Sequence, residues 1–176
     1  MLDVALARWI VAGAAGLALW SLSPVPSYAV GEAPAPPKRC SQYKEGGAAW
    51  KQCMGQKALI DDAEVYAVGY WLAKTGEHAA ALDVLRSASL QSDPRIQTMI
   101  GFSLRKLGMV DEAIAYYAAA LSADSSLTNA RQYLGEAYLQ KGERAKARDQ
   151  LAQIGRLCGT SCEDYRLLSA AIAAAG

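Results

Sequence analysis

The chain has only one histidine, His78, in its 176 residues, and it lacks the short motifs of the commonest catalytic sites. It has no G-x-S-x-G, no H-E-x-x-H and no G-x4-G-K-[ST] segment. One histidine offers little to a Ser/His or Cys/His relay, and we expect His78 to be a solvated or cap-proximal residue in the first turn of a helix. The neighbouring acids Asp61, Asp62 and Glu64 are typical of a helix N-terminus. We therefore predict a protein that is not an enzyme and that needs no cofactor or metal.

A strong net charge is missing as well. The 18 Lys and Arg residues balance 17 Asp and Glu residues, which leaves a formal charge of +1. Nucleic-acid binding has no electrostatic footprint in such a chain. The strand pattern of a βαβ unit is also lacking, so the usual setting of a thioredoxin-like Cys-x2-Cys site is not expected.

What the sequence does contain is a pattern of small residues that occurs three times. A Gly is followed seven residues later by a second Gly and five residues after that by an Ala, and the copies lie 32 and 34 residues apart. The first Gly and the Ala allow two helices to approach closely, and the second Gly can end a helix in a left-handed conformation. The three copies are Gly69/Gly76/Ala81, Gly101/Gly108/Ala113 and Gly135/Gly142/Ala147.

This pattern resembles the tetratricopeptide repeat (TPR) over about residues 61–157. The third copy matches it best, with Leu134 and Gly135, Tyr138, and the close-packing Ala147. The first-helix Trp of the family is replaced in every copy, and its closing Pro occurs only as Pro94. The resemblance implies an all-α fold, a right-handed solenoid of about three helical hairpins that presents a surface to a protein or peptide partner.

Both flanks of the repeats are suited to cover the ends of a short solenoid. Residues 161–175 predict a C-terminal capping helix, with Ser161 and Asp164 in capping-box spacing. An apolar stripe of Tyr165, Leu168 and Ile172 would seal the third repeat. Upstream, residues 48–60 predict a shorter helix.

The N-terminus predicts export. An apolar run at residues 9–22 follows Arg8 and precedes Ser27-Tyr28-Ala29, the small-residue pattern of a signal peptidase site. We expect a signal peptide at 1–29 and a periplasmic or secreted protein. An uncleaved membrane anchor is the alternative. After the signal come a Pro-rich, Cys-containing segment (30–60), whose residues 32–37 form an extended spacer, the repeats (61–157) and the cap (158–176).

The four cysteines flank the repeats in two pairs. Sequential pairing would join Cys40 to Cys53 and Cys158 to Cys162, although four cysteines allow three connectivities. Such disulfides would hold the two ends of the array. The alternative is chemical: Cys158 ends the last repeat helix and Cys162 starts the cap helix, where a lowered thiol pKa favours redox exchange or a soft metal.

The resemblance also implies a binding groove on the first helix of each repeat. Repeat two is basic there and aromatic residues lie nearby, which suggests a peptide with an acidic residue and an apolar anchor. The alternative is a solvated charged face with Phe102 in a packing role, and Trp50 and Trp71 are expected to pack in the core or cap. The predicted groove residues are Tyr66, Tyr70, Lys74, Arg95, Phe102, Arg105, Lys106, Gln132 and Glu136, with Ala63, Thr98, Asn129 and Gln140 at further positions of the same face.

The sequence as a whole predicts an exported scaffold or adaptor of a bacterial envelope complex, with another protein or peptide as its partner. Two alternatives remain open, a periplasmic thiol or metal-handling protein and an inner-membrane-tethered assembly factor. Short arrays also dimerise through exposed terminal repeats, so self-association is open too.

Overall fold

A computed structural model describes residues 33–34, 40–54 and 61–176, and within them every regular element is an α-helix. The expected signal peptide and the remainder of the linker lie outside the described residues. None of the helices in the described part combines the length and apolar character needed to cross a membrane. The helices are α1 (Ala48–Met54), α2 (Asp62–Lys74), α3 (His78–Leu85), α4 (Pro94–Lys106), α5 (Val110–Ala123), α6 (Thr128–Gln140), α7 (Arg144–Cys158) and α8 (Glu163–Ala174).

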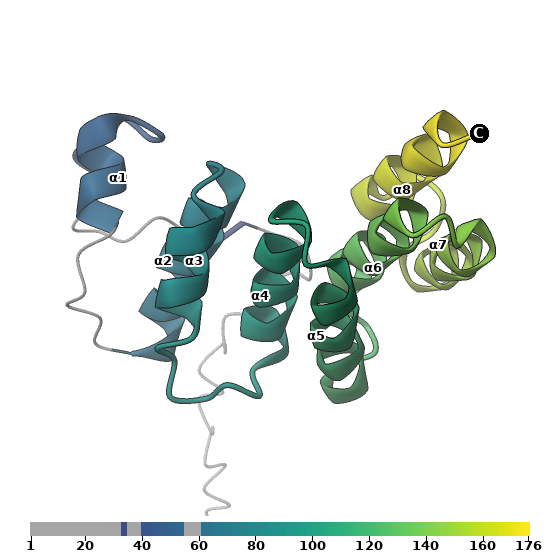
Figure 1. Ribbon diagram of the computed structural model, residues 1–176, viewed down its shortest axis with the longest axis horizontal. Coiled ribbons are helices and arrows are strands. Elements are labelled where there is room, and N and C mark those ends of the chain that lie inside the picture. Colours follow the sequence, from purple (N-terminus) through teal and green to yellow (C-terminus); the bar gives the residue numbers. More distant parts are fainter. Residues whose placement is uncertain (1–32, 35–39, 55–60) are drawn as a thin grey trace, which may run out of the picture.

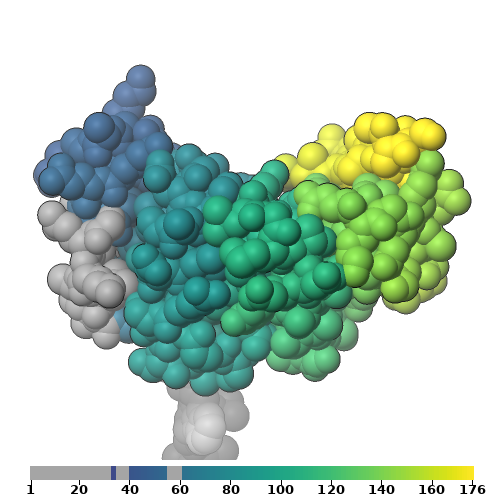
Figure 2. Space-filling model, in the orientation of Figure 1, coloured from purple at the N-terminus to yellow at the C-terminus, as the bar shows by residue number. Residues whose placement is uncertain are grey.

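Three helical hairpins, α2–α3, α4–α5 and α6–α7, form the body of the molecule. Each hairpin packs on the next, and α8 packs on both α6 and α7. Figure 1 shows the hairpins following one another in an arc from α1 at one end to α8 at the other. In Figure 2 one edge of the molecule is hollowed between these two ends. The predicted all-α hairpin solenoid with a C-terminal capping helix is confirmed.

The repeated first glycine lies where a side chain from a neighbouring helix comes closest. A Cβ on Gly69 would fall 2.3 Å from Leu85 Cδ2, and a Cβ on Gly101 would fall 2.7 Å from Tyr117 Cε1. In both cases the close neighbour belongs to the second helix of the same hairpin. The third glycine differs, because its closest neighbour is Leu168 of α8. At this glycine the closest side chain therefore comes from the capping helix, whereas α3 and α5 supply it in the first two hairpins.

The second glycine of each copy ends a helix as expected. Gly76, Gly108 and Gly142 have φ values of 90°, 85° and 75°, a left-handed region that costs a residue with a Cβ additional energy. The residue after Gly76 donates its N–H to Leu72 O, and the same bond recurs in the other two turns. These bonds satisfy carbonyls that the helix end would otherwise leave unpaired.

The two ends of the array depart in part from the predicted elements. Helix α8 begins at Glu163, and its N-cap residue is Cys162, which makes no side-chain capping bond. The predicted Ser161–Asp164 capping box is therefore wrong, because the N-cap is one residue later than that motif requires. The apolar stripe is confirmed, since Leu168 and Ile172 are buried with Tyr165 packed against them.

At the N-terminal end, α1 covers Ala48–Met54, and residues 55–60 lie outside the described part. Trp50 is buried and its ring meets Trp71 edge-on at 6.2 Å. Both tryptophans therefore have the packing role expected for them. Edge-to-face aromatic pairs of this kind add to the stability gained from burial.

Candidate functional site

A large groove lies on the face formed by the first helix of each hairpin. It has a volume of about 1050 Å³ and is lined by α2, α4, α6, the start of α8 and residues 33–34. Of the further positions predicted on this face, Ala63 and Asn129 line the groove, whereas Thr98 is buried in α4 and Gln140 is not among the lining residues. All of the predicted groove residues line it, namely Tyr66, Tyr70, Lys74, Arg95, Phe102, Arg105, Lys106, Gln132 and Glu136. Their role in binding stays a prediction.

Phe102 is surrounded by cations on the α2–α4 side of the groove. Lys74 Nζ lies 5.4 Å from the ring centroid and Lys106 Nζ lies 5.6 Å from it. The ring itself is only 7% exposed and packs on Tyr133 and on His78. Phe102 is thus mainly a packing residue that holds two lysines beside the groove through cation–π contacts.

His78 lies next to the N-cap of α3, which is one of the two positions expected for it, and it is not fully solvated. Its ring is half-buried at the start of α3, with its centroid 5.9 Å from that of Phe102. Burial lowers the pKa of His78, and the nearby charges of Lys106 and Arg105 lower it further. The imidazole therefore belongs to the wall behind the groove.

Arg105 was expected to be available to a ligand carboxylate, and the structure gives it one from the protein itself. Its guanidinium is 4% exposed and lies 2.5 Å from Glu136 Oε2. The other carboxylate oxygen of Glu136 accepts a hydrogen bond from Gln132. Three predicted groove residues therefore form one internal polar chain, which positions the α4 and α6 walls relative to each other.

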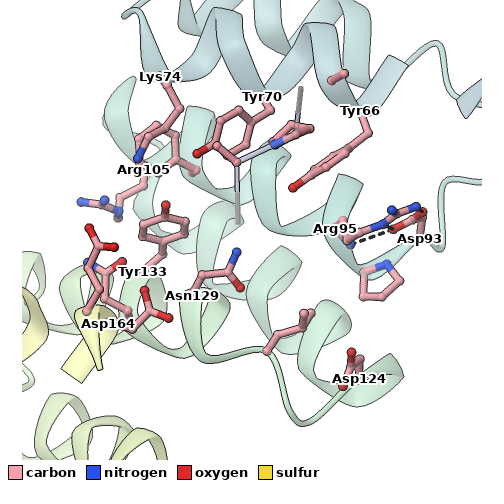
Figure 3. A pocket seen from close by; sticks show the side chains of 18 of the residues that line it. Tyr66, Tyr70, Lys74, Asp93, Arg95, Arg105, Asp124, Asn129, Tyr133 and Asp164 are labelled. Atoms are coloured by element: carbon pink, nitrogen blue, oxygen red, sulfur yellow. Dashed lines mark hydrogen bonds and ion pairs between the residues drawn. The ribbon is translucent and has the colours of Figure 1, made fainter. Parts of the chain in front are cut away.

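A second internal ion pair lies at the other end of the groove (Figure 3). Arg95 Nη2 donates to Asp93 Oδ2 at 2.6 Å, and the guanidinium lies 5.1 Å from the centre of the Tyr66 ring. Burial alone would raise the pKa of Asp93. The hydrogen bonds and the charge of Arg95 outweigh burial and hold this pKa below its usual value. Burial, followed by the neighbouring Tyr70, raises the pKa of Tyr66 to about 12.

The groove also has an acidic wall that the sequence did not indicate. Glu163 and Asp164, in the first turn of α8, line the groove together with Asp124. Burial raises the pKa of Asp164. Burial also raises the pKa of Tyr70, and the charge of Glu163 raises it further. The groove therefore contains carboxylates as well as the basic side chains of repeat two. The carboxylates come from the cap and from an inter-repeat turn, positions that a repeat template does not include.

Tyr133 is the other residue that the family positions did not indicate. It projects from α6 toward the helix that carries Tyr70 and Lys74 (Figure 3). Burial raises its pKa, and the neighbouring Tyr70 and Asp164 raise it further. Its ring lies 6.0 Å from Lys74 Nζ. Tyr133 is thus close to both Lys74 of α2 and Asp164 of α8.

A short piece of the N-terminal segment also lines the groove. Pro34 is buried, and its carbonyl oxygen accepts a hydrogen bond of 2.8 Å from Trp71 Nε1. The neighbouring Ala33 lines the same groove. Residues 32–37 were expected to form only a spacer, and the described part of that segment is instead packed against α2.

Each cysteine in the described part of the chain is in a disulfide. Cys40 pairs with Cys53 and Cys158 with Cys162, with Cα–Cα distances of 5.8 and 5.9 Å. This is the sequential pairing favoured above. Among the described residues, no group of three or more His, Cys, Asp or Glu side chains is arranged to hold a metal ion.

The fold and the groove define a class of protein, a helical-hairpin repeat array with a concave surface lined by its inner helices. A family model described as tetratricopeptide repeat matches residues 104–172, which run from the end of α4 into α8. No curated protein matches the chain.

Among solved structures, the chain is similar to the type III secretion translocator chaperone SycD of Yersinia enterocolitica, in a crystal form described as an alternative dimer. The two share 22% identity, and the similarity covers 68% of this chain and 96% of SycD with a TM-score of 0.58. At this identity the likeness shows the fold alone, and it supports the helical repeat architecture.

Proposed function

We propose that the protein is a non-catalytic scaffold or adaptor that binds a segment of a partner protein in its groove. The observation that carries this proposal is a groove of about 1050 Å³ lined by aromatic and charged side chains from four helices. A groove of this kind suits an extended or helical peptide, because aromatic rings supply buried area and charges fix register. SycD, whose fold is similar, is by its description a chaperone of a translocator.

The charges of the groove define the peptide that fits it. Arg95 and Arg105 are neutralised by Asp93 and Glu136, so the charges that face a ligand differ from those expected for repeat two alone. The lysines left to meet a ligand are then Lys74 and Lys106, and Glu163 and Asp164 are the carboxylates that α8 contributes to the groove. We therefore expect a segment with an acidic group for the lysine side and a basic group for the α8 side.

The proposed location is the periplasm or the outside of the cell. It rests on the signal-like N-terminus, which lies outside the described residues, and on the two disulfides, which persist in oxidising compartments. Mass spectrometry of the purified mature protein tests it. Cleavage after Ala29 supports export, whereas a retained N-terminus favours the membrane-tethered alternative.

A charge-reversal pair tests the groove. Random peptides displayed on phage are selected against the whole protein, and the affinity of the enriched peptides is measured by fluorescence anisotropy. Lys74→Glu changes a groove residue, and Lys146→Glu makes the same change in net charge on α7, outside the groove. We expect Lys74→Glu to weaken binding at least about fivefold, a loss of about 1 kcal/mol. Equal affinity for both variants, or no enriched peptide, contradicts the proposal.

Thiol chemistry is the second candidate function, because Cys158 is exposed at the end of α7. Alkylation and peptide mapping, before and after mild reduction, separate the two candidates. Two bridges that resist mild reduction leave peptide binding as the function. A readily reduced Cys158–Cys162 bridge, or free thiols that retain copper, favours the thiol or metal-handling role.

A further inference from the structure

Pro34 occupies the groove in the manner of a bound peptide. It is remote in sequence from α2, yet it is buried, it lines the groove, and its carbonyl accepts the indole N–H of Trp71 at 2.8 Å. An indole N–H has a single hydrogen to donate. While Pro34 is in place, that donor is therefore not available to the carbonyl of any other segment.

The surroundings of this contact are aromatic. The Trp71 ring meets Tyr70 edge-on at 5.5 Å, and Tyr70 lies 6.1 Å from Tyr66. Tyr66 and Tyr70 line the groove together with Pro34. Aromatic rows of this kind recognise extended proline-containing segments, because the ring of proline is apolar and its backbone is already extended before binding. The α2 end of the groove thus has the chemistry of a proline subsite.

The covalent structure keeps Pro34 close to this subsite. Cys40, a few residues further along the chain, is bonded to Cys53 of α1, and α1 packs on α2 through Trp50 and Trp71. A short tether of this kind gives a segment an effective concentration in the mM range. Even a weak contact between Ala33-Pro34 and the subsite is then well populated.

We propose that Ala33-Pro34 is an internal ligand, which fills a proline subsite at the α2 end of the groove until a proline-containing segment of the partner displaces it. This inference rests on the proposed peptide-binding function and adds to it the partner's chemistry and a built-in competitor. The internal segment reduces the apparent affinity for a partner by the fraction of molecules whose subsite is open. If one molecule in ten is open, the apparent Kd is about tenfold higher than the intrinsic one.

The contact itself is tested first, without any partner. In the ¹⁵N-labelled full chain, the rate of hydrogen exchange of each indole N–H is measured by NMR, and Trp71→Phe assigns the resonance of Trp71. Pro34→Gly is expected to speed exchange at Trp71 at least fivefold while the Trp50 indole is unchanged. Pro36→Gly is the matched control, because it loosens the same linker by the same substitution. If both glycine variants have the same effect, linker flexibility explains the result and the inference is wrong.

Competition is tested second, with a labelled peptide of the sequence of residues 31–39 added to the protein. We expect Pro34→Gly protein to bind this peptide at least fivefold more tightly than the wild type, and a peptide with glycine in place of its first proline to bind neither. Circular dichroism confirms that the variants keep their helices, and Pro34→Ala serves if Pro34→Gly does not fold.

The outcomes also separate this inference from the proposed function. If phage-selected peptides bind the wild type and Pro34→Gly equally, the groove is a binding site and only the internal ligand is refuted. A faster indole exchange with no change in the affinity of any peptide refutes it as well, because the contact is then a structural clasp. If no peptide binds any variant, the proposed function itself fails.

Discussion

The substitution Gly101→Ala tests the close approach of helices on which the hairpins depend. Its new Cβ would lie 2.7 Å from Tyr117 Cε1 and 2.9 Å from Tyr117 Cδ1, and both distances are shorter than real Cβ contacts. The ring cannot move away easily, because Tyr117 is fully buried between its neighbours. The backbone of α4 must therefore shift away from α5, and that shift weakens the packing of the central hairpin.

Two opposing terms set the size of the effect. Overpacking a well-filled core costs typically about 1–3 kcal/mol, and the two short contacts here place the cost near 3. Alanine in place of glycine inside a helix returns about 1 kcal/mol. We expect a net loss of about 2 kcal/mol in the free energy of unfolding, which corresponds to a fall in Tm of roughly 8 °C for a domain of this size.

Gly155→Ala in α7 is the matched control for this experiment. It makes the same chemical change within a helix, but its Cβ would lie 3.2 Å from the ring of the half-buried Tyr165, which can shift. Urea unfolding followed by circular dichroism should find Gly155→Ala at least as stable as the wild type and Gly101→Ala well below both. If the two variants are equally stable, the small residue at 101 is not needed for close packing and the account of the repeat pattern is wrong.

Three further predictions concern charge, pH and the disulfides. Glu136→Gln should cost about 2 kcal/mol or more in urea unfolding, because it leaves the buried charge of Arg105 unpaired, whereas replacing both partners by apolar residues should recover much of the loss. Because the pKa of Tyr66 rises from 10.0 in the unfolded chain to about 12 in the folded one, the free energy of unfolding should fall as pH rises between these values, and less steeply in Tyr66→Phe. Replacing Cys40 and Cys53 by serine should lower stability by about 3 kcal/mol in thermal unfolding, as the chain-entropy estimate gives for a loop of this length.

The repeat core could be predicted from the sequence because local chemistry decides it. Gly76 has to adopt a left-handed conformation, and Ala81 has to sit at a helix crossing, so the same residue types recur wherever the same hairpin recurs. The inner-helix positions follow from the same periodicity. Reading Tyr66, Phe102 and Glu136 as residues of one face required only the helical repeat and the order of the hairpins.

The charge of the groove could not be predicted in the same way, because it depends on distant contacts. The partner of Arg105 comes from the next repeat, and the acidic wall comes from α8, which reaches the groove only because Leu168 packs on Gly135. No spacing within one repeat contains that information. The position of Pro34 is a contact of the same long-range kind, made by a segment whose composition suggests only an extended spacer.

The residues that make this groove particular therefore come largely from outside the repeats. At one end Pro34 lies against the α2 aromatics, and at the other Glu163 and Asp164 extend from a helix whose start follows directly after a disulfide-bonded cysteine. The Cys158–Cys162 disulfide joins the start of α8 to the end of α7, and the Cys40–Cys53 disulfide joins the segment that follows Pro34 to α1. Exchanging α8 for the capping helix of another array should thus alter which peptides bind while leaving the hairpins intact, and altering an outer helix such as α5 should do the reverse.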